Sequence, residues 1–439
     1  MTKRFPSNTL YTNDNLYVLS GMNSESVDLI YLDPPFNSKR MYSAPVGSKA
    51  AGASFKDMWT WQDVDEGYLE TLADNFPALT KYIASVGQVH SKPMMAYLTY
   101  MAQRIVEMHR ILKATGSIYL HCDTTASHYL KHVLDSVFGK NNFRNEIVWH
   151  YRRWTAGKAF QKMHDIILFY SKTDRFMFNK LFIEPTEGQK SKQEKGWDRN
   201  SVMIDGKRQP QLLIYDKEKV DKAIKEGRIN LSDFAKVHHL GATKTTANDV
   251  WIIDHLNSQS KERTGYPTQK PLALLKRIVL ASSNEGDTVL DPFCGCATTC
   301  VAAQQLQRKW IGIDIEKQAV GILVQRLSDA GRLFRDFVAT DQIPKRSDLT
   351  EVQPSLSIKE RLYKEQDVKC NACGTAFEIH HLEIDHIIPK AKGGGDYYEN
   401  YQLLCGSCNR IKGDRTMEYL RMKIEMRERM MKNKIFFGE

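Results

Sequence analysis

Four cysteines in the C-terminal part of the chain are spaced as metal ligands. They form two Cys-x-x-Cys pairs, Cys370 with Cys373 and Cys405 with Cys408. Two such pairs supply four thiolates, which is a ligand set of structural zinc. The start of the chain lacks the apolar stretch of a secretory signal, so metal ligation is favoured over disulfides. The alternative, free thiols in a small core, would leave a unit of roughly 70–80 residues with little to stabilise it.

A second motif, Asp33-Pro34-Pro35-Phe36, directly follows the apolar run 27–32. An exocyclic amine of adenine or cytosine is a poor nucleophile because its lone pair is delocalised into the ring. The Asp33 carboxylate and the Pro34 carbonyl can accept the amine hydrogens and favour a tetrahedral nitrogen, and the prolines would hold these acceptors rigidly. Phe36 can stack on a base that has left the double helix. The alternative for the motif in isolation is a turn that only ends a strand.

A third motif is the Gly-containing turn 291–296, which lies between a strand-like run and a helix-like segment. Ligands of doubly wound sheets bind at such turns, beside the helix N-terminus. Asp314 ends the next strand-like run, where an acid can accept hydrogen bonds from both hydroxyls of a ribose. The turn does not match the pattern G-x-x-x-x-G-K-S/T, which argues against a nucleoside triphosphatase. Taken alone, it can also be an ordinary strand-to-helix connection.

The segments around these motifs alternate between strand-like and helix-like patterns. The expected strands are 27–32, 117–122, 166–170, 288–290 and 310–315. The expected helices are 94–112, ended by Thr115-Gly116, then 125–138, 271–283, 299–306 and 317–333. This alternation predicts an α/β sheet.

The length of 439 residues predicts two to three domains, and 42% hydrophobic residues are enough for a folded core. No apolar run approaches the ~18 residues of a membrane helix, so we expect a soluble intracellular protein without a membrane partner. The net charge of +10 favours nucleic acid as the partner, with a solvated basic surface as the alternative. Much of the excess lies in 151–250, where 20 Lys and Arg stand against 13 Asp and Glu.

Together these motifs resemble the amino-methylating DNA methyltransferases that use S-adenosylmethionine. The resemblance covers about 7–337 and includes the following segments: 33–36, 117–123, 146–149, 266–271, 291–299 and Asp314. It implies a Rossmann-like methyltransferase sheet, S-adenosylmethionine as cofactor and double-stranded DNA as partner. The implied catalytic residues are Asp33, Pro34, Pro35 and Phe36. The implied cofactor-binding residues are Asp291, Phe293, Gly295, Ala297, Thr298, Asp314 and Lys270.

The order of the motifs is that of the β-group of this family, in which the catalytic loop precedes the cofactor loop. The target-recognition region of that group lies between the two loops, where 151–250 lies here. An aspartate at the first catalytic position usually accompanies adenine-N6 methylation, so Asp33 favours adenine, with cytosine-N4 as the alternative. The family's cofactor loop is usually Phe-x-Gly-x-Gly, and Ala297 replaces the second glycine. We expect cofactor binding to be retained but weakened if that backbone needs a positive φ or approaches the cofactor closely.

The Cys/His-rich tail resembles the HNH nucleases over 370–413. The resemblance implies a small zinc-bound ββα-metal domain in which His386 is the general base that activates water. It implies that Asp385 and Asn409 hold Mg²⁺ or a similar divalent ion. Asn400 would orient His386 or shape its loop.

We therefore expect a methyltransferase domain over 1–340, with the recognition region 151–250 inserted in it. A linker over 341–357 and an HNH nuclease domain over 358–439, with a basic C-terminal helix, would follow. This organisation resembles a single-chain restriction–modification enzyme, expected in the cytoplasm of a prokaryote or encoded by a phage. The alternatives are a methyltransferase whose zinc tail only binds DNA, a non-enzymatic DNA-binding regulator, and RNA as the substrate.

Overall fold

The computed structural model describes residues 8–37, 40–45, 47–48, 50–51, 54–64, 72–73, 75–151, 160–183, 187–240, 245–257, 259–329, 337–350 and 352–436. The chain forms two compact units. One is Asn179–Asn248, and the other combines Met1–Phe178 with Asp249–Glu439. Among the described helices, none has the length and apolar character needed to cross a bilayer.

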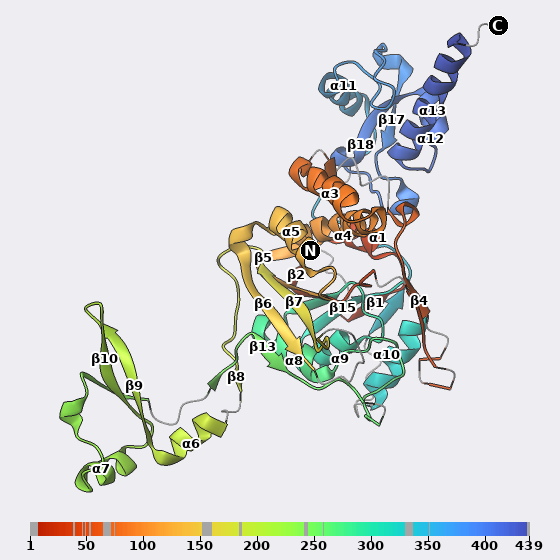
Figure 1. Ribbon diagram of the computed structural model, residues 1–439. Coiled ribbons are helices and arrows are strands. Elements are labelled where there is room, and N and C mark those ends of the chain that lie inside the picture. Colours follow the sequence, from red (N-terminus) through yellow and green to blue (C-terminus); the bar gives the residue numbers. More distant parts are fainter. Residues whose placement is uncertain are drawn as a thin grey trace. The chain divides into compact units, whose positions relative to one another are not determined.

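A nine-stranded sheet forms the centre of the larger unit (Figure 1). Its strands are β1 (Thr9–Tyr11), β2 (Val27–Leu32), β5 (Leu112–Cys122), β6 (Phe143–His150), β7 (His164–Ser171), β13 (Val250–Ile252), β14 (Thr288–Asp291), β15 (Lys309–Ile313) and β16 (Val338–Thr340). The strand order is β13-β6-β7-β5-β2-β14-β15-β1-β16. All strands run parallel except β7, which is antiparallel to β5 and β6. The predicted α/β class is confirmed.

Helices cover both faces of this sheet, which explains why its central strands are almost continuously apolar. One buried cluster joins the sheet to α1 (Asn15–Gly21), α3 (Pro77–Val89), α4 (Lys92–Ile111) and α5 (Ser127–Phe138). The cluster on the opposite face includes α8 (Leu272–Ser282), α9 (Thr298–Gln305) and α10 (Gln318–Asp329). In β2 every residue except Asp28 is buried. The proline pair after β2 ends the strand, because proline has no N–H to continue a ladder.

One predicted helix end is wrong. Helix α4 ends at Ile111, and Thr115 and Gly116 lie inside strand β5. A Cβ added to Gly116 would lie 2.9 Å from the carbonyl oxygen of Asp28 on the neighbouring strand. The glycine therefore permits a close approach of two strands. In the local sequence, a glycine with this role looks the same as one that caps a helix. The predicted helix end at Gly139 is confirmed, with a φ of +83° at that residue.

The smaller unit is built on strands β9 (Trp197–Ile204), β10 (Lys207–Ile214) and β11 (Lys236–His239). It also contains α6 (Glu187–Lys195) and α7 (Lys217–Lys225). Its buried cluster is Trp197, Leu212, Ile214, Val220, Ala223 and Ile229. The predicted recognition region 151–250 also includes strand β7, which belongs to the large sheet. The boundaries of the recognition region remain a prediction.

The C-terminal part has its own buried cluster, which includes Leu362, Leu382 and Leu403. Its elements are α11 (Leu356–Glu365), β17 (Leu382–His386), β18 (Tyr401–Cys405), α12 (Gly406–Lys412) and α13 (Met417–Phe436). Strands β17 and β18 are antiparallel, and α12 follows directly, which is the ββα arrangement that the resemblance implied. In the predicted linker, Ser347 exchanges two hydrogen bonds with the side chain of Asn23, at 2.7 and 2.8 Å.

Candidate active sites

A cavity of about 720 Å³ lies at the carboxyl ends of β2, β14 and β15. Its lining includes Asp33 after β2, Asp291 at the end of β14, and Asp314 after β15. The fold therefore brings the predicted catalytic loop and cofactor loop to one cavity, although the two loops lie far apart in the sequence. Its volume falls in the ~300–1,000 Å³ range of sites for small ligands.

The carboxylate of Asp33 has two different oxygens. The ammonium of Lys270 lies 2.5 Å from Oδ2, and both side chains are mostly buried, 8% exposed for Lys270 and 17% for Asp33. Oδ1 is buried and has no hydrogen-bond partner among the described residues. A buried acceptor without a partner is costly in free energy unless a ligand supplies the donor. Oδ1 therefore fits the predicted role of accepting hydrogens from a substrate amine.

Lys270 was predicted as a cofactor-binding residue, and the structure places its ammonium at the catalytic loop. Besides Asp33, the ammonium contacts the Thr268 carbonyl at 3.4 Å and lies 5.4 Å from the centroid of the Phe36 ring. Lys270 lines the same cavity as the cofactor loop. Its cofactor role stays a prediction, and two of its described contacts are to the predicted catalytic loop.

Three residues that sequence analysis did not assign support Phe36. The Phe36 ring stacks on His121, with centroids 5.9 Å apart. His121 is fully buried, and its ring nitrogens lie 2.9 Å from the Tyr31 hydroxyl and 3.3 Å from Oδ2 of Asp165. Burial favours a raised pKa at Asp165, but hydrogen bonds and charges, those of His121 first, lower that pKa to about 2. The predicted catalytic loop thus packs on a Tyr–His–Asp chain that spans β2, β5 and β7 and in which Tyr31 and His121 are buried.

Backbone amides hold the two acids of the cofactor loop. Asp291 accepts from the N–H of Phe293 at 3.1 Å. Asp314 accepts from the N–H of Gly295 at 2.7 Å and from the N–H of Glu316 at 2.8 Å. Burial raises the pKa of Asp314 to about 6 and that of Asp291 to about 7. The hydrogen bond between Gly295 and Asp314 fixes the proposed ribose acceptor to the loop.

Ala297, which replaces the second glycine of the family's cofactor loop, has a left-handed backbone conformation. Its φ is +58° and its ψ is +33°, a region that costs a residue with a Cβ roughly 1–2 kcal/mol. The condition under which we expected weaker cofactor binding, a positive φ, is therefore met. Ala297 is fully buried and is not part of the described cavity lining, whereas Phe293, Gly295 and Thr298 are. A Cβ added to Gly295 would lie 2.9 Å from the Tyr266 ring, so this glycine cannot be replaced freely.

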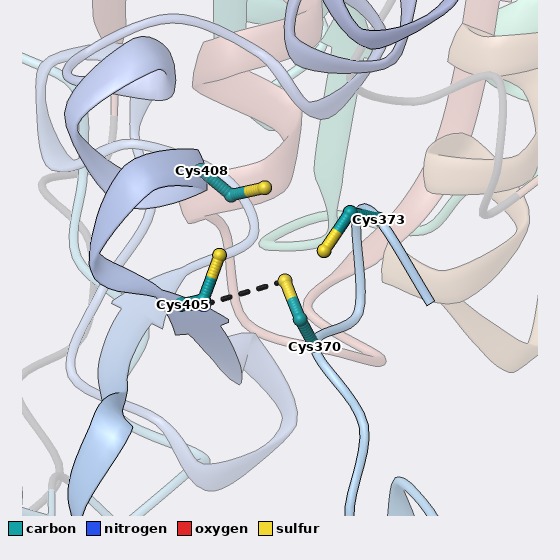
Figure 2. A group of neighbouring side chains, drawn as sticks. All are labelled: Cys370, Cys373, Cys405 and Cys408. Atoms are coloured by element: carbon teal, nitrogen blue, oxygen red, sulfur yellow. Dashed lines mark hydrogen bonds between the residues drawn. The ribbon is translucent and has the colours of Figure 1, made fainter. Parts of the chain in front are cut away.

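Figure 2 shows the four cysteines of the tail pointing toward one another. The Sγ atoms of Cys370, Cys373, Cys405 and Cys408 all lie within 4.8 Å of one another, and the thiols are free. Zn–S bonds of ~2.3 Å in tetrahedral geometry place thiolates roughly 3.8 Å apart. Cys370 and Cys373 precede β17, whereas Cys405 ends β18 and Cys408 lies on α12. The arrangement of the four side chains fits one zinc ion.

The predicted ligands of a nuclease metal lie on one side of β17. Oδ2 of Asp385 forms an ion pair with the Lys412 ammonium at 3.0 Å and accepts a hydrogen bond from the Gln402 amide at 2.9 Å. Asn409 on α12 donates its amide N–H to Glu383 at 2.6 Å, and Glu383 shares a strand face with Asp385. These contacts leave Oδ1 of Asp385 and Oδ1 of Asn409 available, and oxygen atoms of this kind suit a hard divalent cation.

His386 and Asn400 have different partners. The Nε2 atom of His386 lies 2.9 Å from Oδ1 of Asp396. Asn400 instead binds backbone atoms: it accepts from the N–H of Ile388 at 2.8 Å and donates to the Ile388 and Gly395 carbonyls. Of the two predicted roles of Asn400, its described contacts support shaping the loop.

Comparison with known proteins finds two families along the chain. The family model of the N6/N4 DNA methylases matches 27–325, and that of the HNH endonucleases matches 370–415. The chain is 32% identical over 275 residues to the type II methyltransferase M.EcaI of Enterobacter cloacae, a match that covers 56% of this chain and 60% of that protein. It is 28% identical over 362 residues to the DNA adenine methyltransferase YhdJ of Escherichia coli, which covers 80% of this chain and 95% of that protein.

Among solved structures, the chain is similar to the cytosine-N4-specific PvuII DNA methyltransferase. The identity is 13%, the TM-score is 0.41, and the match covers 76% of this chain and 95% of the other. A likeness of this degree says nothing about the target base. The match to the methylase model covers well over half of the chain. The chain therefore belongs to the N6/N4 family of DNA methylases and carries a C-terminal HNH endonuclease domain.

Proposed function

We propose that this protein transfers a methyl group from S-adenosylmethionine to the N6 amine of adenine in double-stranded DNA. The observation that carries the proposal is the buried, partnerless Oδ1 of Asp33 in the cavity that the cofactor loop also lines. Family membership supports the class of reaction. The residues of this site fit the cofactor, because Asp314 supplies a carboxylate that is hydrogen-bonded to Gly295 in the loop before α9.

In the proposed mechanism, bound S-adenosylmethionine supplies an electrophilic methyl group. Asp33 accepts an amine hydrogen at Oδ1 and the Pro34 carbonyl accepts the other, so the nitrogen lone pair leaves the ring system and points to the methyl group. The Lys270 ammonium neutralises Oδ2 and fixes the carboxylate, which limits the choice of acceptor to Oδ1. Phe36 stacks on the base. The same Oδ1 can accept the proton that the methylated nitrogen loses.

Adenine is favoured over cytosine by two observations. The first is the aspartate at position 33, which the resemblance associates with adenine-N6 methylation. The second is similarity over 80% of this chain to a protein described as a DNA adenine methyltransferase. The chemistry of Asp33 also suits cytosine N4, which is the competing assignment.

We assign target recognition to the smaller compact unit, Asn179–Asn248. It contains 14 Lys and Arg against 10 Asp and Glu, a surplus that suits contacts to phosphates. Its sheet and helices form a core separate from the methyltransferase sheet, so its surface can vary without disturbing the cavity. The position between catalytic and cofactor loops is the one that the β-group uses for recognition.

We further propose that the HNH domain cleaves DNA, so that one chain combines restriction with modification. His386 would activate water, and a divalent cation bound by Asp385 and Asn409 would stabilise charge on the phosphate. The four-cysteine zinc site would hold the domain together. The competing hypothesis is a zinc tail that only binds DNA.

The test is incubation of the purified full-length protein with unmethylated genomic DNA, with and without S-adenosylmethionine and Mg²⁺. We expect N6-methyladenine at one sequence motif and Mg²⁺-dependent cuts near the same motif. N4-methylcytosine in place of N6-methyladenine would select the competing base. Methylation without cleavage under any methylation state or divalent metal would favour the tail as a DNA-binding module.

A further inference from the structure

The imidazole of His386 is held by a carboxylate to which sequence analysis gave no role. His386 is the last residue of β17, and its Nε2 lies 2.9 Å from Oδ1 of Asp396. Both side chains are about four-fifths buried, 22% and 18% exposed. Asp396 lies in the loop between η6 (Lys390–Lys392) and η7 (Tyr398–Asn400), ten residues along the chain.

Both oxygens of Asp396 are fixed. The Tyr401 hydroxyl donates to Oδ1 at 3.0 Å, and the Lys390 ammonium donates to Oδ2 at 2.8 Å. The Asp396 carbonyl accepts from the N–H of Val352 at 2.8 Å. The hydrogen bond from Lys390, followed by those from His386 and Tyr401, lowers the pKa of Asp396 to about 2. At neutral pH this residue is therefore a carboxylate, which can only accept hydrogen bonds.

A carboxylate at Nε2 determines which tautomer His386 adopts. The neutral ring must carry its proton on Nε2 to donate to Asp396, which leaves the lone pair on Nδ1. Among the described residues, Nδ1 of His386 has no hydrogen-bond partner. The Tyr401 ring packs against the imidazole with centroids 5.0 Å apart, so the ring plane is fixed as well. Nδ1 is thus left as the atom that can take a proton from water.

The loop around Asp396 is built to keep it in place. Asn400 ties the loop together through its bonds to the backbone of Ile388 and Gly395. A Cβ added to Gly394 would lie 1.8 Å from the Ile388 carbonyl oxygen, so the loop closes too tightly for any side chain there. Asn400 thereby acts on the geometry of the loop, and Asp396 contacts the imidazole itself.

We propose that Asp396 is the positioning residue of the nuclease: it fixes the orientation of His386 and the tautomer in which Nδ1 is the basic nitrogen. The proposal rests on the proposed DNA cleavage by the HNH domain. It assigns to a carboxylate the role that the orienting acid has in a catalytic triad.

The test uses the full-length protein with Asp396→Asn, and with Glu399→Gln as the matched control. Glu399 is exposed in η7, directly after this loop, and its substitution removes the same charge without touching His386. With Asp396→Asn, we expect the single-turnover cleavage rate to fall about 10- to 100-fold. We expect DNA affinity without divalent metal, zinc content and methylation to stay as in wild type. Glu399→Gln should cleave at the wild-type rate.

A spectroscopic measurement tests the proposal even if the asparagine variant misfolds. In wild type labelled with ¹⁵N-histidine, the signals of His386 are those lost in His386→Gln. Their ¹⁵N shifts at pH 8 should report a proton on Nε2, and Asp396→Asn should move the ring toward the other tautomer. A wild-type ring protonated on Nδ1, or a wild-type cleavage rate in Asp396→Asn, would overturn the proposal. Absence of cleavage by the wild-type protein would instead refute the nuclease function, which is a different result.

Discussion

The ammonium of Lys270 lies 2.5 Å from Oδ2 of Asp33, while Oδ1 of the same carboxylate has no partner among the described residues. This asymmetry separates two tasks within one side chain. The ion pair fixes the carboxylate, and in the proposed mechanism the remaining oxygen accepts a hydrogen of the substrate amine. The cofactor role that the sequence motif implied for Lys270 stays a prediction.

Lys270→Met should slow methyl transfer and leave cofactor affinity close to wild type. Loss of the cation leaves a buried carboxylate without its partner, so the acceptor is no longer held in place. We expect kcat to fall about 10²-fold, as for the loss of one group of a preorganised site. Lys276→Met is the control, because it removes the same charge from α8 outside the cavity lining. An unchanged kcat with weaker S-adenosylmethionine binding would show that Lys270 binds the cofactor and does not position Asp33.

Binding of S-adenosylmethionine should weaken as the pH falls through the range of about 6 to 7. Burial raises the pKa of Asp314 to about 6 and that of Asp291 to about 7, so both become protonated in this range. A protonated Asp314 can no longer accept from both ribose hydroxyls. Calorimetric titration of the full-length protein from pH 8 to pH 5.5 measures the effect, and Asp314→Asn should bind weakly with less dependence on pH.

The raised pKa values of Asp314 and Asp291 allow weaker cofactor binding at low pH to be distinguished from unfolding. Between pH 4 and 7 the folded protein holds protons on Asp314 and Asp291 that the unfolded chain has released, since both folded pKa values are raised. These two groups therefore make the cofactor-free fold more stable as the pH falls through this range. A binding constant that stays the same from pH 8 to pH 5.5 would contradict the role of Asp314.

Cys405→Ser should release zinc and unfold the tail without stopping methylation. The tail has only a small buried cluster, so metal binding must supply much of its folding free energy. We expect loss of zinc by metal analysis and rapid proteolysis within 358–439, with methyl transfer near the wild-type rate. His380→Ala is the control, because this side chain is 63% exposed and lies outside the cysteine cluster. A folded tail without zinc would refute the structural role of the metal.

His386→Ala should abolish DNA cleavage and leave both zinc and methylation in place. The substitution removes the proposed base but none of the four thiolates. Cleavage is measured under single-turnover conditions with Mg²⁺, with zinc content determined on the same sample. If this variant cuts as fast as wild type, a nuclease is present but its base is a different residue.

The sequence predicted the elements that end at the two loops, because apolar runs that stop at Asp33 and Asp291 are typical of buried parallel strands. It also predicted the cysteine site, because each half of the ligand set is a local motif. The catalytic loop's support was not predictable in the same way. Asp165 meets His121 only because β7 pairs with β5 in the folded sheet.

Other contacts could not be predicted for the same reason. The spacing that marks Lys270 as part of a motif says nothing about the side chain that its ammonium meets after folding. Glycine is the usual residue at the end of a helix, but Gly116 is required here because the neighbouring strand approaches it closely at Asp28. The residues around Asp396 do not indicate its proposed role, because that role depends on its contact with the His386 imidazole in the folded protein. Residue types and spacing predict elements and ligand sets, while pairings between distant segments depend on the tertiary fold.

The most direct test of the central claim is quantification of methylated bases in unmethylated DNA treated with wild type, Asp33→Ala or His386→Ala. We expect mass spectrometry to find N6-methyladenine with wild type and with His386→Ala. With Asp33→Ala we expect at least a 10²-fold loss, although calorimetry still shows bound S-adenosylmethionine. Methylation by Asp33→Ala at the wild-type rate would contradict the assignment of Asp33 as the acceptor of the substrate amine.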